Sequence, residues 1–171
     1  MSTDFDVATR PVIRWMLKED LPTVLKIEEE SFEFPWTKSD FLSCTHQPHC
    51  IAVVAEVQNQ VVGYMIYEMA PHHFRVLTLA VDPAWRRRGI GRALVERLIN
   101  KLSPHRRHQI LLEVRETNLV AQLFFRSLGF RACRILRNFY ADTVEDAYQM
   151  AYQIPQVPSC QTKNRIARYL A

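Results

Sequence analysis

The stretch PAWRRRGIGRAL, residues 83–94, combines a run of arginines with two glycines, which have no side chain to cover the backbone. Three arginines at 86–88 precede Gly89 and Gly91, and the chain has only 4 glycines in 171 residues, where average usage would give about 12. The first N–H groups of a helix have no partner within the helix and favour an anion, and glycines let a phosphate approach the backbone. This segment therefore predicts an anion-binding loop, although an arginine run is also a common solvated surface and Gly-x-Gly a common turn.

A second chemical group is the glutamate in the apolar segment ILLEV, residues 110–114. Burying a carboxylate costs free energy unless it is paired or used. Glu113 is therefore either a proton acceptor or the partner of an arginine, which would be Arg115 or an arginine of a neighbouring strand. The residue types alone leave both interpretations open.

The elements that must position these groups follow from hydrophobic period and turn signals. Strands are predicted at 12–17, 50–57, 61–69, 74–81, 109–114, 130–136 and about 146–154. Helices are predicted from Leu21 to about Ser31, over 38–46 after a T-x-x-D capping box, from Gly89 onwards, and over 119–128 before Gly129 as a C-terminal cap. The pattern predicts a mixed α/β fold with a central, mostly antiparallel sheet flanked by helices.

Two known phosphate-binding loops fit the arginine-glycine segment poorly. A Walker loop needs G-K-[ST], and the chain has G-R-A at 91–93. A Rossmann loop needs a third Gly or Ala where Leu94 stands, and antiparallel hairpins precede the loop instead of βαβ units. Glu113 does lie about twenty residues further on, as the dinucleotide pattern asks, so this alternative keeps some support.

Composition predicts one globular domain. The chain is 48% hydrophobic and 23% charged, with a net charge of +4 and a pI near 9.0, which suits an anionic ligand and does not require nucleic acid. We expect no membrane span, no direct nucleic-acid binding and a cytoplasmic location. The four cysteines show no metal-ligand spacing, so reduced thiols and no metal site are expected.

Several motifs in order resemble one enzyme family, the GNAT acetyltransferases. They are V-D-P at 81–83, R-x-x-G-x-G at 86–91, L-E-V-R at 112–115, Asn118, and S-L-G-F at 127–130. Within that family, F-P-W at 34–36, L-E-V-R, and R-N-F-Y at 137–140 are similar to the bacterial ribosomal-protein-alanine N-acetyltransferases. The resemblance covers about 11–154 and implies a single GNAT-type domain there, with 155–171 as an appended tail.

The resemblance implies acetyl-coenzyme A as co-substrate. The amides of Arg87–Arg92 would cradle its pyrophosphate, the arginine side chains would face its nucleotide end, and strand residues 79–81 would pair with its pantetheine arm. Asn118 would add a polar contact, although the same residue is also a plausible helix cap. The residues implied to bind acetyl-coenzyme A are Leu79, Ala80, Val81, Arg86, Arg87, Arg88, Gly89, Ile90, Gly91, Arg92, Asn118 and Phe125.

The resemblance also implies the catalytic groups, with one departure. Glu113 matches the family's proton acceptor, and a backbone N–H at Leu79 is our choice of oxyanion donor. The family's tyrosine two residues before S-L-G-F is Phe125 here, which has no proton to donate. Tyr140 is the best substitute as general acid, and its alternative role is an ordinary half-buried aromatic.

The function implied is acetyl transfer to the N-terminal amine of a protein, with the alanine of a small-subunit ribosomal protein as the expected substrate. Two alternatives remain. The enzyme could accept a broader range of peptides or small amines, or the chain could be a catalytically weakened acyl-coenzyme A binding module, for which Phe125 is the argument.

Overall fold

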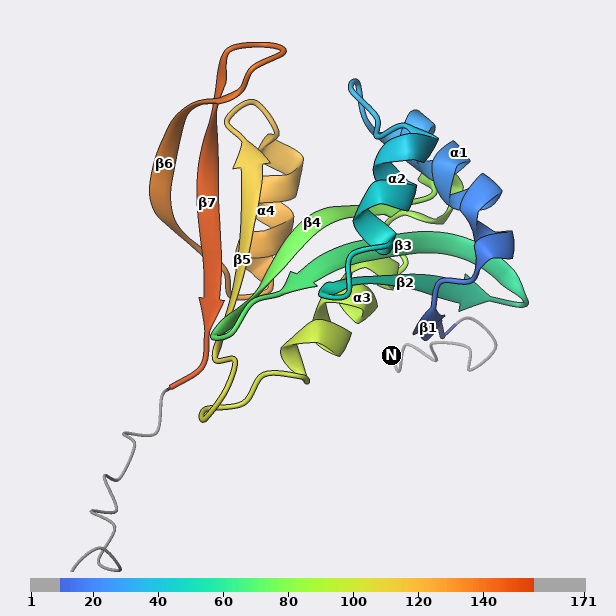
Figure 1. The fold of residues 1–171 in the computed structure, drawn as a ribbon, viewed down its shortest axis with the longest axis horizontal. Coiled ribbons are helices and arrows are strands. Elements are labelled where there is room, and N and C mark those ends of the chain that lie inside the picture. The colour runs from blue at the N-terminus through green and yellow to red at the C-terminus, as the bar shows by residue number, and fades with distance from the viewer. Residues whose placement is uncertain (1–9, 156–171) are drawn as a thin grey trace, which may run out of the picture.

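The computed structural model describes residues 10–155 as one seven-stranded sheet with helices on both faces (Figure 1). The strand order is β1-β2-β3-β4-β5-β7-β6. All neighbouring strands are antiparallel except β4 and β5, which are parallel. The strands are β1 (Val12–Trp15), β2 (Cys50–Val57), β3 (Gln60–Met69), β4 (His73–Val81), β5 (Gln109–Arg115), β6 (Arg131–Tyr140) and β7 (Glu145–Gln153).

The four α-helices begin where local signals place them. The side chain of Thr37 accepts from the amide of Asp40 in a capping box at the start of α2, and Pro22 lies in the first turn of α1. The helices are α1 (Leu21–Ser31), α2 (Lys38–Thr45), α3 (Ile90–Ile99) and α4 (Leu119–Ser127), with short 3-10 turns η2 (Lys18–Asp20) and η3 (Pro83–Trp85). In residues 10–155, none of the helices is long and apolar enough to cross a membrane.

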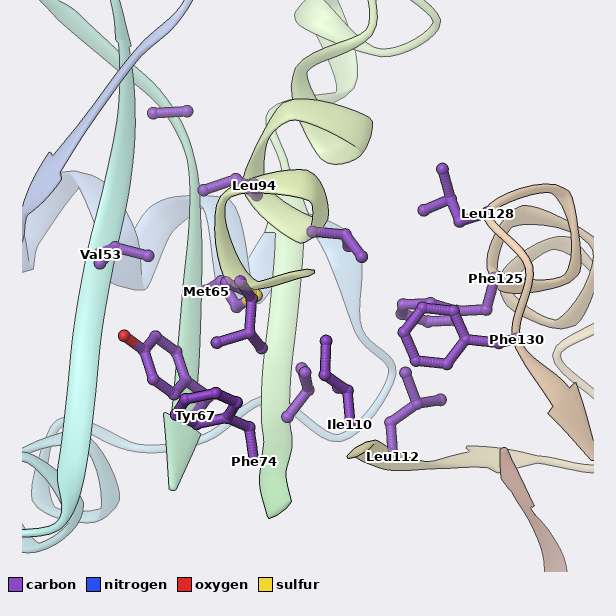
Figure 2. Packing of buried hydrophobic residues seen from close by; sticks show 14 of the residues in the cluster. Val53, Met65, Tyr67, Phe74, Leu94, Ile110, Leu112, Phe125, Leu128 and Phe130 are labelled. Carbon is purple, nitrogen blue, oxygen red and sulfur yellow. The ribbon is translucent and has the colours of Figure 1, made fainter. Parts of the chain in front are cut away.

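Each face of the sheet has its own apolar core. Helices α3 and α4 cover one face, where Figure 2 shows Leu94 and Phe125 on the same side of the sheet as Ile110 and Leu112. Helices α1 and α2 cover the other face, on which Phe41 packs in the same cluster as side chains of β2, β3 and β4. Burying apolar area of this extent supplies the main driving force for folding, and it fixes which side chains of β4 and β5 face each layer.

A β-bulge in β4 changes which face its side chains point to. Ile66 of β3 pairs with Thr78, whereas the next residue, Tyr67, pairs with Val76, so Leu77 is the extra residue. Before the bulge Val76 packs in the core under α3 and α4, and after it Ala80 packs in the core under α1. Thr78 therefore reaches the α1 side of the sheet.

Strands β4 and β5 pair over only part of their length. Their register runs from His73 with Gln109 to Val76 with Leu112, while β4 continues to Val81 and β5 to Arg115. Figure 1 shows β5, β7 and β6 turning away from β2, β3 and β4 beyond that point. The separation leaves a wedge in the middle of the sheet.

Two predicted strands end two or more residues away from where the observed strands end. The first ends at Trp15 instead of residue 17, because the amide of Leu17 donates to the Asp20 side chain at 2.7 Å and begins the turn into η2. The strand predicted at 130–136 runs on to Tyr140 as β6, past an irregular register where Asn138 has a φ of 50°. β6 is an exposed edge strand, so no alternation of buried residues marks its end. The predicted tail lies outside the described residues beyond Pro155, as does Cys160.

Candidate active site

A cavity of about 200 Å³ fills the wedge between β4 and β5. Residues from both layers line it, so the opening passes through the sheet. Ala121 and Phe125 line the cavity from the α4 side. Glu28, Tyr140 and three further aromatic side chains line it from the α1 side. Those three aromatics, which we call the aromatic wall, are Phe32, Phe34 and Trp36.

Glu113 lies at this cavity on β5 and is well buried. Its side chain is 8% exposed. The Nε of Arg75 donates to Glu113 Oε2 at 3.1 Å, and Nε2 of Gln149 donates to Oε1 at 3.0 Å. The ion pair to a neighbouring strand's arginine is thus present. A carboxylate has about four lone-pair positions, so two donors leave Glu113 able to accept a further hydrogen bond.

Tyr140 reaches the cavity from the end of β6. The guanidinium carbon of Arg115 lies 3.8 Å from the centre of its ring and 5.2 Å from that of Phe34, which is cation–π geometry. Burial raises the pKa of Tyr140, against an opposing effect of Arg115. Arg115 also donates to Asp142 at 2.9 Å, so one residue joins the aromatic wall to the β6–β7 hairpin.

Phe125 lines the same cavity from α4 and is 7% exposed. Its ring contacts Phe124 and Phe130, with centroids 5.0 and 5.4 Å away. A phenylalanine is well suited to this apolar packing, and it offers no proton to the cavity.

The arginine-glycine segment forms the turn into α3. Gly89 is the N-cap with a φ of 80°, a left-handed conformation that favours glycine. Arg86 is bound to the carbonyl of Val81 and the hydroxyl of Ser31, Arg88 stacks on a tryptophan ring, and Arg92 pairs with Glu96. Three of the four arginine side chains thus have partners in the protein, and the first amides of α3 have no acceptor within the helix.

Four further predicted residues flank the wedge. Leu79, Ala80 and Val81 pair with β3 on one edge, while their other edge faces the separation from β5. Asn118 caps α4, because its Oδ1 accepts from the amide of Ala121 at 3.0 Å, and it also lines the cavity. The cap that the sequence allows is therefore formed.

Glu28 is a site residue that the sequence reasoning missed. It lies on α1, is 1% exposed and lines the cavity. Burial raises its pKa from the ordinary 4.5 to about 7, against opposing hydrogen bonds from the Trp36 amide and the Thr78 hydroxyl. A signal was present, because Val24, Ile27 and Glu28 have the i, i+3, i+4 spacing of one helix face.

Comparison with known proteins agrees with this architecture. The profile of the acetyltransferase (GNAT) family matches residues 15–130. The [ribosomal protein bS18]-alanine N-acetyltransferase of Escherichia coli K12 is 34% identical over 137 residues, which cover 79% of this chain and 92% of that protein.

Two solved structures have the same fold at moderate identity. The crystal structure of the ribosomal-protein-S18-alanine N-acetyltransferase from Escherichia coli has a TM-score of 0.77 at 31% identity, covering 88% of this chain and 97% of that one. Ard1 from Thermoplasma volcanium has a TM-score of 0.77 at 27% identity, covering 88% and 100%. The chain belongs to the acetyltransferase (GNAT) family and is an N-acetyltransferase that uses acetyl-coenzyme A.

Proposed function

We propose that this enzyme acetylates the N-terminal α-amine of a protein, and that its substrate is the N-terminal alanine of ribosomal protein bS18. The observation that carries the proposal is the opening through the sheet, lined by α4 on one side and by Glu113, Tyr140 and the aromatic wall on the other. Such an opening lets the acyl donor and the acceptor amine meet from opposite faces. The named substrate of the Escherichia coli relative supplies the identity of the acceptor.

The anion loop fits a coenzyme that carries a pyrophosphate. The bare Cα of Gly89, with no protein atom within 4 Å of where a Cβ would stand, leaves space beside the first turn of α3. The amides of Arg87–Arg92 would hold the pyrophosphate, and residues 79–81 would pair with the pantetheine arm along the free edge of β4. Acetyl-coenzyme A supplies a thioester, whose carbonyl carbon is the electrophile.

Glu113 accepts the proton as the amine nitrogen attacks that carbon. The new C–N bond forms, the C–S bond breaks, and the electron pair leaves on sulfur, to which the Tyr140 hydroxyl donates a proton. The backbone N–H of Leu79 stabilises the oxyanion. An α-amine with a pKa of about 7.7–8.0 is ~10–20% neutral at pH 7, whereas a lysine with a pKa near 10.4 is below ~0.1% neutral. The α-amine therefore depends less on deprotonation by Glu113.

The test of the substrate is a peptide panel. Peptides with the bS18 N-terminal sequence and different first residues are incubated with the enzyme and acetyl-coenzyme A. We expect the highest kcat/KM for alanine. Equal rates for all first residues would show a broader peptide acetyltransferase, and coenzyme binding without turnover would show a weakened binding module.

The phenylalanine at position 125, where the family has a tyrosine, gives a separate prediction about the general acid. A thiol with a pKa near 8.5 departs readily as thiolate, so Phe125→Tyr should leave coenzyme affinity unchanged and raise kcat only where proton donation limits turnover. Tyr140→Phe should lower kcat, because in our proposal Tyr140 donates the proton. Steady-state kinetics of both variants decide this, and unchanged rates in both would show that thiolate departure needs no acid from the protein.

We also infer the setting in which the enzyme acts. A ribosomal-protein substrate and acetyl-coenzyme A place the reaction in the cytoplasm. The acceptor is a polypeptide, so the enzyme does not need to contact nucleic acid directly. The catalytic domain spans residues 11–154 in this proposal, with 155–171 as an appended tail.

A further inference from the structure

Glu28 is the most buried carboxyl group of the described chain, and nothing in the proposed reaction uses it. Asp20 is also buried, but it has an ion pair with Arg14 at 2.7 Å. Within residues 10–155, no ion pair of Glu28 is formed. Burying a carboxyl group without a cation costs free energy. The hydrogen bonds of Glu28 are the contacts that offset this cost.

One oxygen of Glu28 holds the segment between α1 and α2. The amide of Trp36 donates to Glu28 Oε1 at 2.8 Å, eight residues along the chain. The aromatic wall lies in that segment, and Phe34 is 45% exposed at its tip. This bond therefore fixes the wall relative to α1.

The other oxygen reaches the strands of the wedge. The hydroxyl of Tyr64 on β3 donates to Glu28 Oε2, and the same hydroxyl lies 3.1 Å from Thr78 Oγ1 on β4. Thr78 faces this side only because of the bulge at Leu77, and Leu79 follows it directly. Glu28 thus joins the aromatic wall to the part of β4 that lines the cavity.

We propose that Glu28 is a positioning residue for the acceptor, which holds the aromatic wall at a fixed place across the cavity from Glu113. The proposal rests on the proposed function, because the wall is taken as the surface that receives the acceptor peptide. Glu28 itself does not touch the reacting atoms. Its loss should therefore change the KM for the peptide more than the affinity for the coenzyme.

The kinetic test uses three variants with one control. Glu28→Met removes its hydrogen bonds at similar size, Glu28→Gln keeps the oxygen that accepts from Trp36, and Tyr64→Phe removes only the phenol that donates to Glu28 Oε2. Glu29→Gln, on the exposed face of α1, is the control. We expect Glu28→Met to raise the peptide KM about tenfold or more, with the affinity for coenzyme A within twofold of wild type. Glu28→Gln and Tyr64→Phe should have smaller effects, and the control none.

Hydrogen exchange measures the same contact without any activity. In Glu28→Met the amide of Trp36 should lose its protection, while Glu28→Gln should keep it. If wild type acetylates no peptide, the proposed function fails and the exchange result still decides whether Glu28 holds the wall. Unchanged protection in Glu28→Met, or a lower kcat at unchanged peptide KM, would overturn the proposal. Should Glu28→Met not fold, the smaller rise in peptide KM expected of Glu28→Gln and Tyr64→Phe, against none for Glu29→Gln, tests the proposal, and an unchanged KM in both would overturn it.

Stability against pH gives a further readout. The groups that face Glu28 are the Tyr64 phenol from β3, the Thr78 hydroxyl from β4 and the Trp36 amide. Its folded pKa of about 7 is above the ordinary 4.5, so its contribution to stability is full below pH 4.5 and is lost as pH rises through 7. The Tm of wild type minus that of Glu28→Gln should fall by about 5–10 °C from pH 5 to pH 8. A constant difference would contradict a carboxyl group buried in this way.

Discussion

Replacing Glu113 with glutamine lowers kcat/KM by about 10²–10⁴ at pH 7, the range that general bases contribute. Glutamine keeps the shape and can still accept from Arg75 and donate or accept at Gln149, but it cannot take a proton at neutral pH. The acceptor amine deprotonates without help above its pKa of about 8, so the deficit should shrink as pH rises. The measurement is the pH–rate profile of the variant beside that of wild type.

The ion pair between Arg75 and Glu113 supplies a control that distinguishes a catalytic base from a carboxylate with only a structural role. Arg75→Gln removes the partner at 3.1 Å and leaves the carboxylate in place. If Glu113 is the base, Arg75→Gln should lose less than tenfold in kcat/KM. If Glu113 only anchors Arg75, both variants should lose the same activity and both profiles should run parallel to that of wild type, which would end the base assignment.

A side chain at Gly89 should weaken coenzyme binding by about tenfold or more. A hydrogen bond to a charged group contributes about 1.5–3 kcal/mol, and 1.4 kcal/mol is a factor of ten in affinity. A Cβ at Gly89 meets no atom of the rest of the protein within 4 Å, so we expect the Gly89→Val side chain to act on coenzyme binding by occupying open space at the start of α3. The φ of 80° adds strain of about 1–2 kcal/mol, which lowers the Tm as well.

Gly129 provides a control for backbone strain away from the loop, with an added contact of 3.2 Å between a Cβ there and the Tyr152 ring. It has a φ of 95° and lies after α4. Gly129→Ala should lower the Tm and leave the affinity for coenzyme A, measured by calorimetry, within twofold of wild type. An affinity within twofold for Gly89→Val as well would show that the loop does not hold the coenzyme.

Most helices and strands could be predicted from short stretches of sequence, because the interactions that begin and end them join residues close together in the chain. The capping box of Thr37 and Asp40 needs only three residues of separation, and the β2–β3 hairpin has φ angles of 50° and 63° at Gln58 and Asn59, as a tight turn requires. The strand and helix that flank Gly89 were predicted for the same reason. The fold class followed from their order.

The site was less predictable because its geometry depends on contacts distant in sequence. The bulge at Leu77 depends on pairing with β3, and only the bulge turns Thr78 toward α1. Arg75 and Gln149 are separated from Glu113 by 38 and 36 residues, so the sequence could offer a neighbouring strand's arginine but not name it. The place of Glu28 in the site could not be predicted, because its partners come from β3 and from the segment between α1 and α2, which only the folded chain brings together.

The central claim is that acetyl goes to the N-terminal α-amine, and one measurement tests it directly. A peptide with a free alanine terminus and an internal lysine is incubated with the enzyme and acetyl-coenzyme A at pH 7, and fragment mass spectrometry locates the acetyl group. Our account predicts acetyl on the alanine α-amine, with release of one coenzyme A thiol per acetyl transferred. Acetyl on the lysine side chain alone, or no acetylated peptide from an enzyme that binds the coenzyme, would contradict it.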